Sequence, residues 1–266
     1  MITKKEFLDY FEKDDEKTIA TNIFEKIKLI DYGVNTSTDY FYPPNIWSKI
    51  LVIKSKLNCQ VTTYGYFAES ERRVISFTEV SEELNPIQLI RIKNLSKFKE
   101  LTHKDYLGAL MGLGLKREKM GDLIVKDNFC YLPTFQEIGD IIINELKTVG
   151  KNPVEVEFSS ESNIEYKFEE YEILIASNRL DALISSITKL SREDSVKIIE
   201  KGEVSVNYLE IKEKSFEIKD ESRISIKGFG KFTFVGIVGK TKKDKMKVLV
   251  KKFIWIWNKK LTHKLK

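Results

Sequence analysis

The sequence has few of the residues on which covalent and metal chemistry most often depend. Its 266 residues include two cysteines, Cys59 and Cys130, and two histidines, His103 and His263. The cysteines lie far apart without CxxC spacing, so we expect both to be reduced and structural rather than zinc ligands. So few histidines argue against a Ser-His-Asp triad and against a histidine-based metal site. We therefore expect no catalytic residue, no metal and no cofactor.

Long apolar runs are also lacking, and we expect no signal sequence. No stretch approaches the roughly 18 apolar residues that a membrane-spanning helix needs. The first fifteen residues are charged throughout, unlike the apolar core of a secretory signal. Because 42% of the residues are hydrophobic and 32% are charged, we expect a soluble globular protein of two or three domains. We expect it to be cytoplasmic, monomeric and without a membrane partner.

Charge is plentiful and unevenly distributed. The whole chain holds 45 Lys and Arg against 40 Asp and Glu. Residues 179–266 alone hold 22 against 11, which leaves 23 against 29 for residues 1–178. A basic C-terminal third on a mildly acidic body is typical of a protein that binds a polyanion such as RNA. A solvated lysine-rich surface would give the same excess, and charge alone does not separate the two interpretations.

The segment from Arg179 to Phe232 predicts two short helices followed by β-hairpins. Asn178 is expected to cap the first helix, with Asp181 facing its N-terminal N–H groups. Ser191 is expected to cap the second helix, and Gly202 to end it. The apolar face of the first helix consists of Leu180, Leu183, Ile184 and Ile187. Alternating apolar residues predict the strands, at Val204 and Val206 and at Ile224 and Ile226.

The basic residues of this segment belong to neither apolar pattern, and we expect them to contact the phosphates of a structured RNA. Polar residues of the same motifs and a basic run beyond the strands complete the candidate interface. Its members are Arg179, Ser191, Arg192, Lys197, Lys201, Asn207, Lys227, Lys231, Lys240, Lys242 and Lys243.

At these positions the chain resembles the S4 RNA-binding domain. The matching residues are Arg179-Leu180-Asp181, Ser191-Arg192, Gly202-x-Val204-x-Val206-Asn207 and Ile224-Ser225-Ile226. Many such domains have Gly after the Asn, whereas this chain has Tyr208. Because tyrosine tolerates positive φ poorly, we expect a wider turn here than the tight turn of those domains.

Residues 85–160 predict the element order βαββαβ, which is the split-βαβ or ferredoxin-like arrangement. Thr102 is expected to cap the first helix and Thr134, with Glu137 three residues on, the second. The expected strands are Ile87–Ile92, Asp122–Val125, Phe129–Leu132 and Val154–Phe158. This fold hosts RNA recognition modules and many unrelated functions, so it does not by itself give a function.

Four glycines surround a basic turn in this region, at positions 108, 112, 114 and 121. A dinucleotide-binding loop follows a strand and opens a helix, whereas these glycines end a helix and precede a strand. A structural turn is therefore the favoured interpretation. Nucleotide binding, or an RNA contact through Lys116, Arg117 and Lys119, are the alternatives.

The first 82 residues predict helices, then two strands joined by a charged turn. That turn contains Glu69 and Glu71 followed by Arg72 and Arg73, so it predicts either internal salt bridges or a contact of the two arginines with RNA. At the other end of the chain, Trp255 and Trp257 stand among lysines and predict a packed extension, with base stacking as the alternative.

The sequence thus predicts an α+β protein of three parts. These are an N-terminal α/β region at residues 1–82, a ferredoxin-like middle domain at residues 83–165, and an S4-type domain with a basic extension at residues 166–266.

Stretches along the whole chain are similar, in the same order, to the YlmH-like S4-domain proteins of Gram-positive bacteria and cyanobacteria. They are T-x-Y-F-Y-P-P, G-Y-F-A-E-S-E-R-R, H-K-D-Y-L-G-A-L-M-G-L-G-L-K-R-E-K-M-G-D-L and the S4 motifs, and the resemblance covers residues 20–253. It implies a non-catalytic RNA-binding protein of ribosome-associated quality control. Its implied partners are the rRNA of the large ribosomal subunit and peptidyl-tRNA, after a stalled ribosome has split.

Two other classes of function stay open at this point. An RNA-modifying enzyme tethered by its S4 domain would need a catalytic motif of its own, and Arg179-Leu180-Asp181 already belongs to the S4 helix. A methyltransferase would usually have a glycine-rich loop after its first strand, which this sequence lacks. An adaptor linked to cell division, using the acidic body of the chain, is the other alternative.

Overall fold

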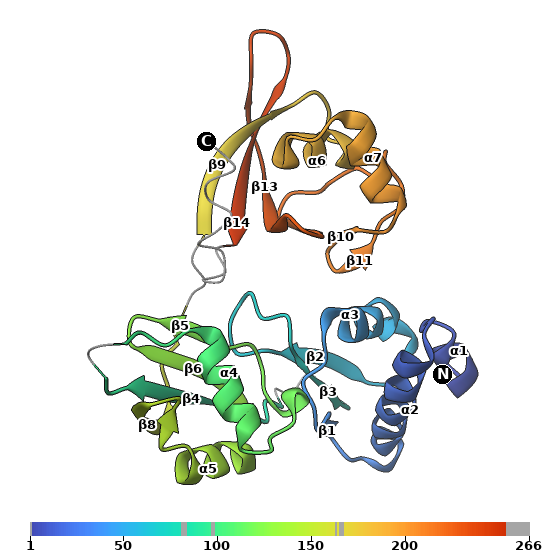
Figure 1. Cartoon of the computed structure of the whole chain (residues 1–266). Coiled ribbons are helices and arrows are strands. Elements are labelled where there is room, and N and C mark those ends of the chain that lie inside the picture. The colour runs from blue at the N-terminus through green and yellow to red at the C-terminus, as the bar shows by residue number, and fades with distance from the viewer. Residues whose placement is uncertain (1, 81–83, 97–98, 163, 165–167, 254–266) are drawn as a thin grey trace. The chain divides into compact units, whose positions relative to one another are not determined.

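The structure is a computed structural model that describes residues 2–80, 84–96, 99–162, 164 and 168–253 (Figure 1). The chain divides into two compact units, residues 1–165 and 166–266. Helices combine with three antiparallel sheets, which confirms the expected α+β class. Trp255 and Trp257 lie outside the described residues. No helix of the described part is long and apolar enough to cross a membrane.

The first unit begins with helices packed beside a small sheet. Its elements are α1 (Lys4–Leu8), α2 (Asp14–Lys28), η1 (Leu29–Tyr32), β1 (Thr36–Ser37), α3 (Pro44–Ile53), η2 (Lys54–Lys56), β2 (Gln60–Tyr64) and β3 (Val74–Thr78). The three strands pair in the order β1-β3-β2. Phe7 of α1 lies 5.2 Å from Phe24 of α2, measured between ring centroids, so apolar side chains at helical spacing join the first two helices.

The first unit continues with a five-stranded sheet and two helices. Its elements are β4 (Ile87–Asn94), α4 (His103–Gly112), η3 (Arg117–Lys119), β5 (Ile124–Lys126), β6 (Phe129–Phe135), α5 (Gln136–Glu145), β7 (Thr148–Val149) and β8 (Asn152–Ser159). The strand order is β5-β6-β4-β8-β7. The expected order βαββαβ is present, with β7 as one added short strand. Leu110 of α4 and Ile142 of α5 enter the same core as Ile90 and Leu132 of the sheet.

One helix cap in this region was predicted correctly and the other wrongly. Thr102 and Asp105 form a reciprocal capping box at the start of α4. Thr134, however, is buried in β6, where its hydroxyl donates to the Lys119 carbonyl oxygen at 2.9 Å. The helix instead begins after Phe135 without a side-chain cap. Thr134 is therefore part of the sheet and does not cap α5.

The second unit is a six-stranded sheet with two helices. Its elements are β9 (Phe168–Ile175), α6 (Leu180–Thr188), α7 (Arg192–Glu200), β10 (Val204–Val206), β11 (Leu209–Glu210), β12 (Ser222–Ile226), β13 (Gly230–Lys240) and β14 (Met246–Phe253). The strand order is β11-β10-β12-β13-β14-β9, and all neighbours are antiparallel. The fully buried Leu183 and Ile199 of the helices pack in one core with Ile224, Phe234 and Val250 of the sheet.

Of the caps predicted for α6 and α7, the cap of α7 is confirmed and that of α6 is wrong. Ser191 caps α7 as expected, accepting from the Asp194 N–H at 3.1 Å. Gly202 ends that helix with φ +71°, a left-handed conformation that glycine adopts without a Cβ clash. The cap predicted at Asn178 is wrong, because its amide donates to the Ile218 carbonyl oxygen at 2.6 Å and α6 begins after Arg179 instead.

The wide turn expected after Asn207 is also wrong. Val206 pairs directly with Leu209, so Asn207 and Tyr208 form a two-residue turn, with φ +48° and +70°. Positive φ at both central residues is the signature of a type I′ hairpin turn. Arg223 stabilises this conformation, since its backbone N–H donates to the Asn207 side chain at 2.9 Å and its guanidinium donates to the Tyr208 hydroxyl. Tertiary contacts thus override the poor tolerance of tyrosine for positive φ.

Candidate nucleic-acid interface

A buried carboxylate joins two of the candidate arginines in the second unit. Arg179 immediately precedes α6 and Arg192 opens α7. Asp181 Oδ2 lies 3.0 Å from Arg179 Nη2 and 3.2 Å from Arg192 Nη2. Because α6 and α7 pack against each other, Arg192 reaches the carboxylate of Asp181, which lies eleven positions earlier in the sequence. We call Arg179, Asp181 and Arg192 the arginine pair cluster.

The burial of the three side chains differs in a way that matters for binding. Asp181 is only 3% exposed, whereas Arg179 and Arg192 are 37% and 58% exposed. Burial raises the pKa of the Asp181 carboxyl, but hydrogen bonds and charge from the two arginines outweigh it, so the pKa lies below its ordinary value. The carboxylate is therefore ionised at neutral pH. The cluster carries a net charge of one positive unit on two partly exposed guanidinium groups, the group that best matches phosphate.

The candidate lysines of the second unit lie at the surface, several in exposed ion pairs. The pairs are Lys197 with Glu193 and Asp194, Lys227 with Glu203, and Lys240 with Asp244, at 2.8–3.2 Å. Exposed pairs of this kind contribute little free energy. A lysine can therefore leave its carboxylate partner and contact a phosphate instead. Lys201, Lys242 and Lys243 form no ion pair within the described part of the chain.

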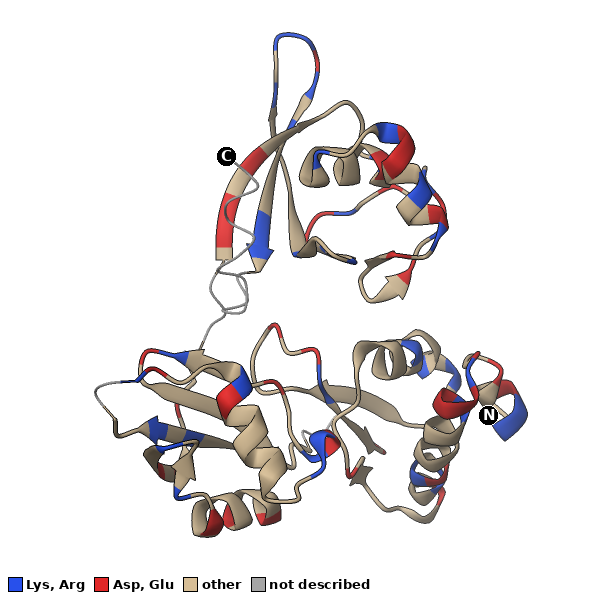
Figure 2. Cartoon of the chain, in the orientation of Figure 1, with Lys and Arg blue, Asp and Glu red and all other residues tan. Residues whose placement is uncertain are grey.

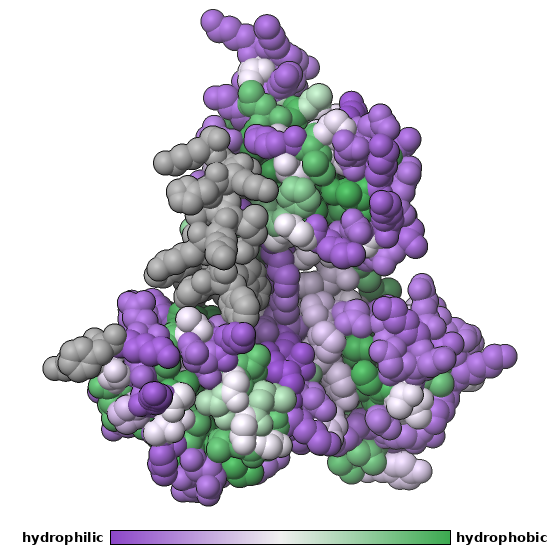
Figure 3. Space-filling view, in the orientation of Figure 1, coloured by the Kyte–Doolittle hydropathy of each residue, from purple (hydrophilic) through white to green (hydrophobic). Residues whose placement is uncertain are grey.

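The candidates do not form one continuous track. Lys227 and Lys231 lie near the start of β13, whereas Lys240, Lys242 and Lys243 lie at and beyond its end. Eleven residues of strand span roughly 35 Å, so these are two separate basic patches. The second patch occupies the tip of the β13–β14 hairpin, which projects from the sheet and carries blue segments in Figure 2 and hydrophilic side chains in Figure 3.

Sequence reasoning missed contacts made by two residues of this unit, Asp181 and Arg223. Asp181 accepts from the Ala182 N–H of α6 at 2.8 Å, as expected, but it also pairs with the two arginines, which was not expected. Arg223 was not a candidate, although its guanidinium lies 5.2 Å and 5.3 Å from the ring centroids of Tyr208 and Phe253. Burial lowers the Arg223 pKa to about 10, so it remains charged at neutral pH. Asn207 supports this turn through its side chain, which gives it a structural role.

Arg72 and Arg73 hold loops of the first unit together. Arg72 donates to the carbonyl oxygens of Met120 at 3.3 Å and Phe41 at 3.0 Å. Arg73 donates to the Ser70 carbonyl oxygen at 2.9 Å, and its guanidinium lies 4.6 Å from the Trp47 ring centroid. Arg72 and Arg73 thus donate to backbone oxygens of the first unit, and Arg73 also donates to the Thr63 hydroxyl at 3.3 Å.

The second basic turn of the first unit is similar. Arg117 Nη1 donates to the carbonyl oxygens of Met120 and Gly121 at 2.6 and 2.9 Å, and burial lowers its pKa to about 10. Lys119 donates to the Asp39 carbonyl oxygen at 2.9 Å. Lys116 is exposed, and of these three it alone makes no such contact within the described residues. These contacts account for Arg117 and Lys119 without an RNA.

Two of the glycines beside this turn lie where the helix α4 ends. Gly112 ends α4, and Gly114 follows it with φ +79° while its N–H donates to the Met111 carbonyl oxygen at 3.0 Å. The chain then enters the short 3-10 helix η3 and the strand β5 rather than an α-helix. These two glycines thus lie in a structural turn, and the order of elements is not that of a nucleotide-binding loop.

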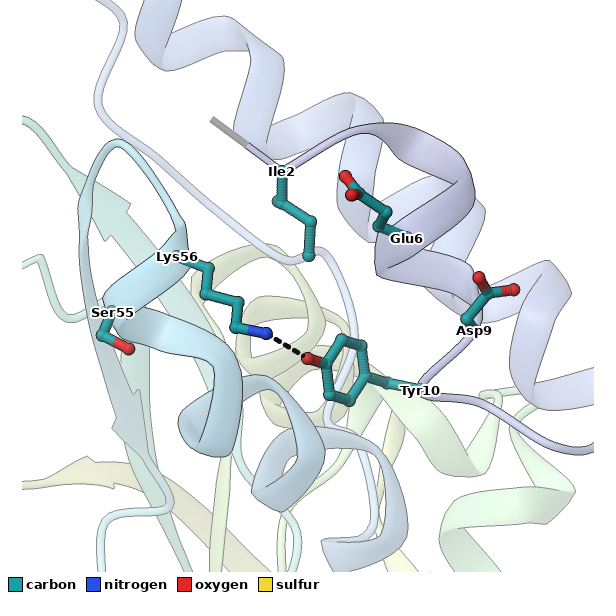
Figure 4. A pocket seen from close by; sticks show the side chains of 6 residues that line it. All are labelled: Ile2, Glu6, Asp9, Tyr10, Ser55 and Lys56. Atoms are coloured by element: carbon teal, nitrogen blue, oxygen red, sulfur yellow. Dashed lines mark hydrogen bonds between the residues drawn. The ribbon is translucent and has the colours of Figure 1, made fainter.

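A shallow hollow of about 640 Å³ lies between α1 and η2 (Figure 4). Lys56 Nζ donates to the Tyr10 hydroxyl across it at 2.7 Å. The carboxylates of Glu6 and Asp9 line the same hollow, so its charge does not suit a phosphate. The described residues contain no group of three side chains placed to hold a metal ion.

Three comparisons with known proteins bear on this chain. A family model described as "Putative RNA-binding domain in YlmH" matches residues 81–163. A protein of Bacillus subtilis (strain 168), named ribosome-associated protein quality control protein P2, is 32% identical over 246 residues, covering 90% of this chain and 95% of that protein. A solved structure named cell division protein ylmH from Streptococcus pneumoniae is 22% identical, with a TM-score of 0.45, covering 56% of this chain and 93% of its own.

The Bacillus relative agrees with the resemblance carried by the sequence motifs. Its similarity extends across both units and reaches beyond the region that the family model matches. Because such identity spans nearly the whole of both proteins, the chain belongs to the YlmH family.

Proposed function

We propose that this protein binds structured RNA without catalysing a reaction, and that it acts in ribosome-associated quality control. Its partners would be the rRNA of the large ribosomal subunit and peptidyl-tRNA after a stalled ribosome has split, and it would act in the cytoplasm as a monomer. The name of the Bacillus relative, ribosome-associated protein quality control protein P2, supports this role. The family match at residues 81–163 supports RNA as the ligand.

The observation that carries the proposal is the arginine pair cluster. Two guanidinium groups are fixed by one buried carboxylate, and each leaves N–H donors at the surface. A fixed pair of guanidinium groups loses little entropy when it binds phosphate, so it sets the register of an RNA backbone. Lys201 and the lysines at either end of β13 would add electrostatic attraction over a larger footprint.

The proposal includes an assignment for each part of the chain. Residues 166–266 would be the S4-type RNA-binding domain, and residues 83–165 a ferredoxin-like domain that also contacts RNA. The strand order β5-β6-β4-β8 agrees with the second assignment. Residues 1–82 would form an α/β region that packs on the middle domain.

A co-sedimentation experiment with large ribosomal subunits tests the role of the cluster. Arg179→Ala with Arg192→Ala should weaken binding and reduce the slope of log affinity against log salt by about 1.5, since each phosphate contact contributes roughly 0.7–0.9. Lys13→Ala with Lys17→Ala removes the same charge from exposed positions of the first unit and should leave the slope near that of the wild type.

Removing both arginines leaves Asp181 buried without its partners, so folding must be measured alongside binding. Adding Asp181→Ala to the double variant removes the unpaired charge and separates lost contacts from lost stability. If either folded variant co-sediments as well as wild type across the salt series, the cluster is not the main contact. Incubation with bulk tRNA and rRNA, followed by analysis of modified nucleosides, tests the absence of catalysis, and any turnover would contradict it.

A further inference from the structure

A hollow in the first unit is lined by aromatic side chains and one arginine, and the proposed RNA contacts do not account for it. It holds about 440 Å³, within the range of small-ligand pockets. The loop that joins β2 to β3 contributes most of its lining (Figure 1). The side chains that matter here are Tyr64, Tyr66, Phe67, Arg73, Asn85 and Ser162.

The loop is held in one conformation by contacts within itself. The hydroxyl of the fully buried Ser70 donates to the Gly65 carbonyl oxygen at 2.6 Å and accepts from the Phe67 N–H at 3.2 Å. A Cβ at Gly65 would lie 2.2 Å from the Ser70 Cβ, so the backbone passes too close for any other residue. The side chains on this loop are therefore presented from a rigid support.

Tyr66 adopts a backbone conformation that tyrosine disfavours. Its φ is +74°, in the left-handed region. Its hydroxyl donates to the Glu161 carbonyl oxygen at 3.2 Å, and its ring lies 5.6 Å from the Phe67 ring, between centroids. Tyr66 is partly exposed and lines the hollow. Strain of this kind is found at ligand clamps, where the surrounding structure holds a side chain in place for contact.

The charge of the hollow favours an anionic ligand. Arg73 is the only charged side chain among the described residues that line it. Its guanidinium is fixed against Trp47 and by three hydrogen bonds, to Ser70, Thr63 and Ala68 oxygens. Such a group has five N–H donors, so donors remain for a phosphate oxygen. Aromatic faces beside a fixed positive charge match an unpaired nucleotide, whose base stacks while its phosphate is neutralised.

We propose that this hollow binds one unpaired nucleotide of a single-stranded RNA segment. The base stacks on Tyr66, with Tyr64 beside it, and the phosphate lies near Arg73. Asn85 and Ser162 complete the lining from the region that the RNA-binding family model matches, which favours RNA over a protein partner. The inference rests on the proposed function for its class of ligand, but the site lies in the other unit from the arginine pair cluster.

Fluorescence anisotropy with a labelled single-stranded hexa-adenylate tests the inference on the full chain. Tyr66→Gly removes the ring and suits φ +74°, so the loop should keep its shape while the affinity falls about tenfold, as loss of one stacked base predicts. Tyr66→Phe should bind as wild type. Tyr32→Ala, a ring 81% exposed elsewhere in the first unit, controls for non-specific stacking.

A second variant keeps the test valid if Tyr66→Gly lowers the melting temperature. Asn85→Asp adds a negative charge at the exposed edge of the hollow, while its Oδ1 can still accept from the Ile87 N–H. It should weaken hexamer binding by repulsion of phosphate and leave the fold intact.

The outcomes separate this inference from the proposed function. If hexamer binding is absent, or equal in wild type and Tyr66→Gly, the nucleotide site is wrong, and a protein partner becomes the alternative occupant. If the Arg179 and Arg192 variants lose the hexamer while the hollow variants keep it, the RNA binds at the second unit and the inference is also wrong. Loss of subunit binding in the cluster variants with hexamer binding retained would support both.

Discussion

Asp181→Asn tests whether the buried carboxylate stabilises the second unit by holding its two arginines. The substitution keeps the shape of the side chain and removes its charge. At an effective dielectric constant of about 20, two charges 3 Å apart attract by about 5 kcal/mol. The measured benefit must be much smaller, because burying the carboxylate costs free energy and Arg179 and Arg192 are 37% and 58% exposed to screening solvent.

We expect Asp181→Asn to lower the free energy of unfolding by about 2 kcal/mol at pH 7, which is less than the roughly 3–5 kcal/mol of a fully buried pair because both arginines are partly exposed. In a unit of about 100 residues this corresponds to a fall of roughly 10 °C in Tm. Urea denaturation followed by circular dichroism measures the change. Asp244→Asn is the matched control, because that side chain is 85% exposed in its pair with Lys240 and should change stability by less than about 0.5 kcal/mol.

The pH dependence of the difference gives an independent check. The folded pKa of Asp181 lies below its ordinary value, so the carboxylate contributes stability above about pH 4, the range of an unfolded aspartate. That contribution falls as the pH drops through the lowered folded pKa. Wild type and Asp181→Asn should therefore converge in stability at acidic pH. Equal denaturation midpoints at pH 7, or a gap that widens on acidification, would refute the electrostatic explanation.

Two further predictions concern glycines and thiols. Gly108→Ala should stabilise the protein by up to about 1 kcal/mol, because no atom lies within 4 Å of the added Cβ in α4. Gly65→Ala should destabilise it by more than about 2 kcal/mol, because the added Cβ clashes with Ser70. Comparing the melting curve of each variant with that of the wild type checks both predictions. Cys59 and Cys130 should react slowly with iodoacetamide at pH 8, since burial raises the Cys59 pKa to about 11 and Cys130 is fully buried; rapid alkylation of folded protein would contradict this.

Local sequence patterns determined much of the second unit. The apolar spacing of α6 and the alternation of β10 and β12 depend on side chains that must face one core, so the period alone identifies them. Ser191 and Gly202 were likewise assigned correctly, because a hydroxyl cap and a left-handed helix end depend on neighbours within a few residues. In the first unit, the same reasoning gave the order of strands and helices from β4 to β8, except for the short strand β7.

Where a side chain chooses among several partners, local patterns failed. Thr134 and Asn178 were both assigned as helix caps, but each instead donates to a backbone carbonyl of another segment, that of Lys119 and that of Ile218 respectively. Tyr208 occupies a turn that its own preference disfavours, because Arg223 from another strand supplies compensating contacts.

The sequence by itself determined the family, the α+β class and the presence of basic residues on the second unit. Only the tertiary structure decided which of those residues act together. Arg179 and Arg192 meet because helix packing brings Asp181 between them, while the strand β13 separates Lys231 from Lys240 by its own length. In the first unit, folding turned Arg72 and Arg117 toward backbone carbonyls and left Tyr66 in an open hollow. The physical reason is that charge and composition are additive along a chain, whereas hydrogen bonds and burial depend on which distant segments the core brings into contact.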